Sequence, residues 1–78
     1  MRITVKLYAT LRQYQPDAPR AGLLLNVPVG TTVGEVLPRL GLPDGVPLVA
    51  MVNDRVEHLD HVLTEGDTLS LFPPVAGG

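Results

Sequence analysis

Alternation of apolar and polar residues at both ends of the 78-residue chain sets the tightest limit on its fold. Residues 2–8 place their aliphatic side chains on one face of an extended segment and Tyr8 on the other. Residues 68–72 point two leucines inward and Ser70 and Phe72 outward. A period of two is typical of strands that bury one face. The pattern therefore predicts half-buried strands near both ends of the chain.

One segment between these strands has the pattern of a helix. Thr32 is followed three residues later by Glu35, a spacing that forms a capping box, and Gly41 stands where a helix C-cap belongs. Pro38 lacks the N–H that an α-helix needs and disfavours the helical conformation of the residue before it. We therefore predict a helix that begins after Thr32 and is short or kinked near Pro38.

The remaining segments predict three more strands, joined by turns. The apolar runs at 22–30 and 48–52 have strand length, the second as a central strand, and residues 56–58 fit a short edge strand. The other predicted elements are a short helical segment at 10–15, a Pro-rich loop at 15–22, a single helical turn at 59–63 and a turn at Gly66. Together these elements predict an α+β domain in which one main helix packs on a mixed sheet of about five strands.

The composition excludes several classes of site. The chain has no cysteine, which excludes disulfides, thiolate metal sites and a cysteine nucleophile and fits a reducing compartment. Its net charge is −2 and it has no basic run, so we expect no binding to nucleic acid. No apolar run reaches membrane-span length and no signal-peptide pattern follows Met1. We expect a cytoplasmic protein that binds no membrane.

The chain finishes with the sequence FPPVAGG. With glycine near 7% of residues, two glycines at two given positions are expected in roughly 0.5% of chains. A frayed end or a cloning scar would explain such a tail without any function. We interpret residues 1–72 as the folded domain and residues 73–78 as a flexible tail ending in Gly-Gly.

From end to end, the chain resembles the MoaD/ThiS family of sulfur carriers, which are ubiquitin-like β-grasp proteins. The similar segments are KLYATLRQ, GTTVGEVLPRLGL, VNDR and DHVLTEGDTLSLFPPVAGG. The last of these is close to the pattern of the molybdopterin synthase small subunits. Gln13 stands where the family has an acid, and Pro38 and the loop at 16–19 also depart from the family pattern. These departures concern the scaffold and leave the tail intact.

The resemblance implies a function for the tail. An ATP-using adenylyltransferase of the ubiquitin-activating type adenylates the Gly78 carboxylate, and a sulfur donor such as a cysteine desulfurase or rhodanese converts it to a thiocarboxylate. The carrier then docks on a synthase catalytic subunit and delivers sulfur to a precursor of the molybdenum cofactor. It is not an enzyme by itself and binds no cofactor, because the partner uses the ATP.

The residue types of the tail suit this chemistry. Gly77 and Gly78 have no Cβ, so their backbone fits a narrow channel. Pro73 and Pro74 favour an extended segment, which lowers the ordering cost when a partner captures the tail. We expect the tail to enter partner active sites through five residues before Gly78: Pro73, Pro74, Val75, Ala76 and Gly77.

Three alternative functions would fit the same tail. Sulfur delivery to thiamine, cysteine or thiolated tRNA is a variant of the carrier function. A ubiquitin-like modifier would instead join Gly78 to lysines of target proteins, and its chemistry is the same up to the acyl-adenylate. A β-grasp binding module with an inert tail is the third possibility.

Exposed aromatic residues indicate where partners dock. Alternation puts Tyr8 and Phe72 on the outer face of their strands, and in a β-grasp sheet the first and last strands are neighbours. We predict that they form a docking patch, joined by Val56, although two isolated surface aromatics would give the same pattern. Arg12 follows the first strand and is a candidate to pair with a carboxylate of a partner or of its own chain.

His58 and His61 are the only histidines and are flanked by acids. A helix would place both imidazoles on one face, where they could contribute to a metal site. Two histidines without a third good ligand are a weak signal, and we predict no metal. A solvated turn, with Asp60 or His61 capping the segment 59–63, is the alternative.

Overall fold

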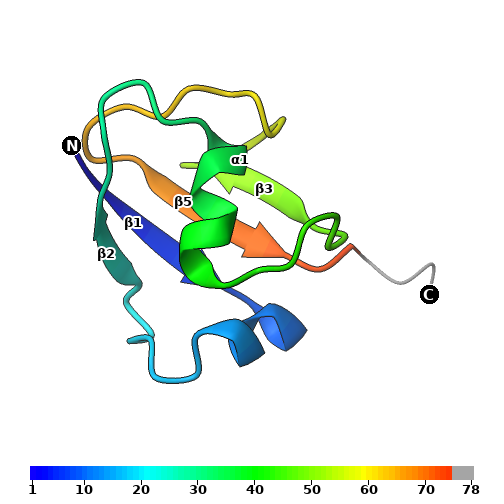
Figure 1. The fold of residues 1–78 in the computed structure, drawn as a ribbon. Coiled ribbons are helices and arrows are strands. Elements are labelled where there is room, and N and C mark those ends of the chain that lie inside the picture. The colour runs from blue at the N-terminus through cyan, green and yellow to red at the C-terminus, as the bar shows by residue number, and fades with distance from the viewer. Residues whose placement is uncertain (75–78) are drawn as a thin grey trace.

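The fold is built on a single mixed β-sheet. The computed structural model describes residues 1–74. The sheet order is β2-β1-β5-β3-β4, so the first and last strands are neighbours at its centre (Figure 1). β1 and β5 are parallel, and the other paired strands are antiparallel. The strand bounds are Arg2–Leu7 (β1), Leu23–Asn26 (β2), Val49–Val52 (β3), Arg55–Glu57 (β4) and Thr68–Phe72 (β5). The predicted α+β architecture with five strands is confirmed.

The main helix begins and ends as its sequence predicts. The Thr32 N–H donates to Glu35 Oε1 at 2.8 Å, and the Glu35 N–H donates to Thr32 Oγ1 at 3.3 Å, which completes the capping box. The α-helix α1 (Val33–Val36) then tightens into the 3₁₀ helix η2 (Leu37–Leu40), which contains Pro38. Gly41 ends the segment at a φ of 81°, a left-handed conformation that suits glycine. This helical segment crosses one face of the sheet (Figure 1).

The core lies between that helical segment and the sheet. A second 3₁₀ helix, η1 (Ala9–Tyr14), confirms the predicted segment after β1 and adds Leu11 to the core. Leu7 on β1 and Leu25 on β2 pack against this core but are only partly buried. The buried apolar residues are Ile3, Val5, Leu11, Val27, Val33, Val36, Leu40, Leu42, Ala50, Val52, Leu63, Leu69 and Leu71.

One strand prediction is confirmed and another needs refinement. β3 pairs with β4 on one side and β5 on the other, so it is an interior strand as predicted, and β5 lies at the centre of the sheet. Ser70 does point away from the core, but it is buried, at 9% exposure. Its neighbours in register are Lys6 on β1 and Met51 on β3, so longer side chains flank it on both sides.

The predicted helical turn at 59–63 is wrong. The His61 N–H donates to the His58 carbonyl at 3.0 Å, which closes a turn, and Val62 then forms a β-bridge with Thr32. The first N–H groups of a helix lack partners within it. Here the Val33 and Gly34 N–H groups donate to the carbonyls of His61 and Leu59, at 3.0 and 2.8 Å. The segment does not form a helical turn, because the carbonyls of Leu59 and His61 accept hydrogen bonds from the first N–H groups of α1.

Hydrogen bonds to the Asp67 side chain connect the β3–β4 turn to the segment that precedes β5. The carboxylate accepts hydrogen bonds from Asn53 Nδ2 at 3.1 Å and from the Thr64 N–H at 2.8 Å. Asn53 lies in this turn with a φ of 57° and accepts a bond from the Thr68 N–H. Partial burial raises the pKa of Asp67, but the bonds from Thr64 and Asn53, with nearby His61, outweigh it and leave the pKa below its ordinary value.

This network predicts a pH-dependent stability. The pKa of Asp67 is lower in the folded state, so its ionised form stabilises the fold above the ordinary pKa of 3.8, and this contribution is lost as pH falls through the folded-state pKa. Asp67→Asn is expected to lower the free energy of unfolding at pH 7 by about 1–3 kcal/mol and to weaken its acid dependence. Urea melts between pH 7 and pH 3 measure both effects. Asp17→Asn, at an exposed position, is the control; an equal loss there would contradict the role of Asp67.

Candidate functional site

The base of the C-terminal tail leaves the sheet from its central strand. β5 is paired on both sides up to its end, with Val49 opposite Phe72 and the Tyr8 N–H donating to the Leu71 carbonyl at 3.0 Å. Pro73 follows, and a proline has no N–H with which to continue the ladder. The chain therefore exits at a defined place and direction.

Tyr8 and Phe72 stack on each other at this exit. Their ring centroids are 4.4 Å apart and their planes differ by 11°. The cause is the parallel register, which pairs Leu7 with Leu71 and so puts the next two residues side by side. The sequence prediction that the rings are close is confirmed, and they are not isolated surface aromatics. Phe72 is half-buried rather than fully solvent-facing, while Tyr8 remains 38% exposed.

An apolar groove continues from this stack across the sheet face opposite α1. It is lined by Ala9, Thr10, Val49, Met51, Phe72, Pro73 and Pro74, and we call it the tail-base groove. Val49 and Met51 were missed as site residues because the run LVAMV resembles a fully buried strand. All five residues of this run are apolar, so the sequence carries no alternation that marks them. Their alternating exposure in β3 depends on which face the sheet leaves uncovered.

Val56 lies one strand beyond the groove. It is 68% exposed and pairs in register with Met51, so the two residues share the face opposite α1. The predicted link from Val56 to the aromatic pair therefore passes through Met51, which lines the groove. Val56 does not itself line the groove.

Arg12 lies on η1 and is exposed. Within residues 1–74, no carboxylate comes within 4.0 Å of its guanidinium group. Pairing with its own chain, one of the two alternatives for Arg12, is therefore not seen in this part of the protein. The side chain lines a hollow on the other side of Tyr8, together with Lys6 and Arg20.

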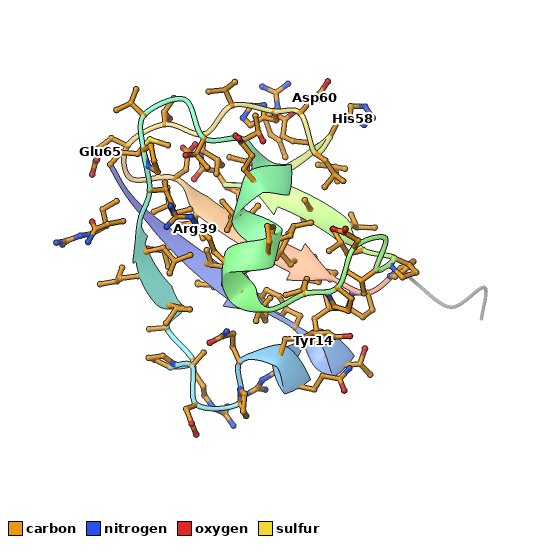
Figure 2. All side chains as sticks on the ribbon, viewed as in Figure 1. Tyr14, Arg39, His58, Asp60 and Glu65 are labelled. Atoms are coloured by element: carbon orange, nitrogen blue, oxygen red, sulfur yellow. The ribbon has the colours of Figure 1, made fainter. Side chains whose placement is uncertain are left out.

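Neither histidine lines the tail-base groove. Figure 2 shows His58 and Asp60 near each other at the edge of the molecule. His61 Nδ1 is 3.5 Å from Glu57 Oε1, and neither histidine belongs to a helix, so the predicted capping role is wrong. In the part of the chain that the structure describes, no three His, Cys, Asp or Glu residues are grouped as a metal site requires.

The reacting end of the predicted tail is outside the described residues. This applies to the threading residues Val75, Ala76 and Gly77 and to Gly78. The division into a domain at 1–72 and a tail at 73–78 stays a prediction, although β5 does end at Phe72. Among residues 1–74, no helix is long and apolar enough to span a bilayer.

Known proteins share this fold and this sequence pattern. The molybdopterin synthase sulfur carrier subunit of Escherichia coli (strain K12) is 51% identical over 39 residues, which are 50% of this chain and 47% of that protein, so the match spans about half the length of this relative. The crystal structure of SAMP1 from Haloferax volcanii superposes with a TM-score of 0.76, at 26% identity, over 100% of both chains. A protein–protein complex of subunits 1 and 2 of molybdopterin-converting factor from Helicobacter pylori 26695 contains a chain with a TM-score of 0.64, at 21% identity over 100% of both chains, which supports the fold alone.

These similarities confirm the predicted ubiquitin-like β-grasp fold. The family model described as the ThiS family matches residues 5–78, nearly the whole chain and both ends of the sheet. The chain therefore belongs to the ThiS family.

Proposed function

We propose that this protein is a sulfur carrier whose Gly78 carboxylate becomes a thiocarboxylate and supplies sulfur for molybdopterin biosynthesis. The observation that carries the proposal is the tail base, where the Phe-Pro-Pro segment leaves the central strand beside a stacked aromatic pair. The 51% identity with the sulfur carrier subunit of E. coli molybdopterin synthase supports it over half the chain. Membership of the ThiS family supports it over residues 5–78.

The proposed chemistry is acyl transfer in two steps. A carboxylate is a poor electrophile, so it first attacks the α-phosphorus of ATP, and pyrophosphate leaves. The outer sulfur of a persulfide on the donor then attacks the carbonyl of the acyl-adenylate, and AMP leaves. A second thiol cleaves the S–S bond of this acyl disulfide, which releases the thiocarboxylate and forms a disulfide. The carrier supplies the carboxylate and its positioning, whereas the partners supply the active sites, so the protein is not an enzyme by itself and binds no cofactor.

Three partners follow from this chemistry. An adenylyltransferase of the ubiquitin-activating type uses the ATP, and a cysteine desulfurase or rhodanese donates the sulfur. A synthase catalytic subunit accepts the charged carrier, and the complex of subunits 1 and 2 in H. pylori is the precedent for this contact. We assign the tail-base groove and the Tyr8–Phe72 stack to the docking surface, because an apolar surface beside the exit of the tail positions Gly78 for a partner.

A ubiquitin-like modifier is the second candidate. Two crystal structures of H. volcanii SAMP1, the small archaeal modifier protein 1, support it, because they superpose over 100% and 95% of this chain. In that case the activated Gly78 would form an isopeptide bond with a lysine of another protein. The chemistry of the two candidate functions differs only after the Gly78 carboxylate has been adenylated.

Intact-mass measurement of the protein purified from its own host tests the proposal. A mass increase equal to replacement of one oxygen by sulfur, located at Gly78 by fragmentation, is the expected result. Peptides of other proteins that carry a Gly-Gly remnant on lysine would favour the modifier instead. An unmodified terminus in cells that actively make molybdenum cofactor, together with no such remnants, would refute both candidates.

Replacement of Phe72 tests the docking surface. Phe72→Ala is expected to weaken binding to the synthase catalytic subunit at least tenfold, since truncation of a buried interface aromatic costs roughly 2–4 kcal/mol. Loss of the stack with Tyr8 also removes about 0.5–1.5 kcal/mol of stability beyond the lost burial. Isothermal titration and thermal melts measure the two effects separately.

Leu24→Ala is the matched control, because Leu24 is 61% exposed on the same sheet face, at the far edge in β2. It should leave the affinity unchanged. Tyr8→Ala should act like Phe72→Ala, and the double variant should be non-additive because the rings are in contact. If Phe72→Ala only destabilises the fold and the folded fraction binds normally, the docking surface lies elsewhere.

A further inference from the structure

A hollow of about 210 Å³ beside Tyr8 gathers half of the basic residues of the chain. Lys6, Arg12 and Arg20 line it, and these are three of the six lysines and arginines in a protein of net charge −2. They come from three different segments: β1, η1 and the loop between η1 and β2. Only the tertiary structure brings them together.

The loop that carries Arg20 is anchored at both ends, to η2 through Gln15 and against β1 at Gly22. The Gln15 side chain donates to the Leu40 carbonyl at 2.8 Å, and two turns close through Ala18 N–H to Gln15 and Gly22 N–H to Pro19. Gly22 has a φ of +113°, and a Cβ on it would collide with Thr4 and press on Lys6. Glycine at this position therefore lets the loop lie close against β1 beside Lys6.

The positive charge in the hollow is not neutralised by the described chain. No carboxylate of residues 1–74 lies within 4.0 Å of Lys6, Arg12 or Arg20. Asp17, in the same loop, is exposed and does not line the hollow. Three uncompensated cations in a concave surface concentrate positive potential, which attracts an anion.

The donors present favour a carboxylate on a protein over a free phosphate. Anion cradles for phosphate use successive free backbone N–H groups. Here the N–H groups of Gln15 and Ala18 already donate to the carbonyls of Arg12 and Gln15, and Pro19 has no N–H to offer. The charged donors that line the hollow are the side chains of Lys6, Arg12 and Arg20. The arginine guanidinium group pairs with a carboxylate through two parallel hydrogen bonds.

We propose that this hollow receives an acidic segment of the protein partner that covers the tail-base groove. Tyr8 lines the hollow and stacks on Phe72, so the cationic and apolar surfaces are continuous. The apolar part contributes burial, and the cationic part selects the partner and its orientation. The identity of the partner rests on the proposed function; the acidic chemistry does not.

A partner-independent experiment uses a hexaglutamate peptide and inorganic phosphate as probes in NMR titrations. Saturable shifts at Lys6, Arg12 and Arg20 are expected with the peptide, with smaller ones from phosphate at equal charge. The double variant Arg12→Glu/Arg20→Glu should lose the peptide response. The matched control Arg2→Glu/Arg55→Glu changes the net charge equally at exposed positions of the sheet and should keep it. Equal shifts at all basic residues, or tighter binding of phosphate than of peptide, would overturn the proposal.

The second experiment measures affinity for the synthase catalytic subunit across a range of salt concentrations. The double variant should bind at least tenfold more weakly at low salt, and its affinity should depend less on salt than that of the unsubstituted protein. The control should bind normally. If the control loses as much affinity, net charge rather than the hollow is responsible. If thiocarboxylate never forms while the peptide still binds the hollow, the sulfur-carrier proposal fails and the acidic-partner proposal stands.

Discussion

Deletion of Gly78 is expected to abolish activation of the protein while leaving its fold intact. The carboxylate that attacks ATP must lie at a fixed reach from the docked domain, and removal of one residue shortens that reach by about 3.3–3.6 Å. Displacement of reacting atoms by even 1 Å can reduce a rate about 100-fold. ATP–pyrophosphate exchange with the cognate adenylyltransferase measures the loss.

Two companion variants make this test specific. Addition of one residue after Gly78 should also abolish exchange, because the carboxylate then overshoots the active site. Ala76→Gly keeps the length of the tail and should support exchange. Since the buried core lies within residues 1–74, thermal melts of all three variants should match that of the unsubstituted protein. Undiminished exchange by the truncated protein would refute the carrier and the modifier proposals together.

Replacement of Leu71 by alanine is expected to lower the free energy of unfolding by about 2–5 kcal/mol. Leu71 is fully buried on the central strand, between Leu7 on β1 and Ala50 on β3. Truncation there removes apolar burial and leaves a cavity that the paired strands on both sides prevent from closing. Domains of this size have only modest stability, so a loss of this order threatens folding at physiological temperature.

Urea melts measure the effect, with Leu24→Ala as the control at an exposed position on an edge strand. The control should change the free energy of unfolding by less than about 0.5 kcal/mol. A loss below about 1 kcal/mol for Leu71→Ala would mean that the core does not depend on the inward face of β5. The fold itself should need no metal and no disulfide, since the chain has no cysteine.

Features that depend on neighbours in the sequence were predicted correctly. The alternation in β1 and β5, the capping box at Thr32 and Glu35, and the left-handed Gly41 are all properties of a few consecutive residues. Their energetics are local, because a side chain caps its own helix and a strand presents alternate faces whatever its partners are. The aromatic stack also followed, once β1 and β5 were taken as neighbours.

Features that depend on distant segments were not predictable in this way. Ser70 is buried because the central strand has flanking side chains on both sides, and residues 59–63 stay open because their carbonyls bind the start of α1. Both outcomes result from hydrogen bonds or packing between elements that no local pattern records.

The candidate site also combines features that depend on neighbouring residues with features that depend on distant segments. The sequence alone indicated the tail, the aromatic pair and Arg12 as candidates, because these are residue types in a recognisable order. The groove beside Val49 and the hollow shared by Lys6, Arg12 and Arg20 exist only after the sheet order has brought separate segments to one surface. The physical reason is that residues far apart in the chain together line a concave surface and contribute its charge. Strand pairing determines which of these residues become neighbours.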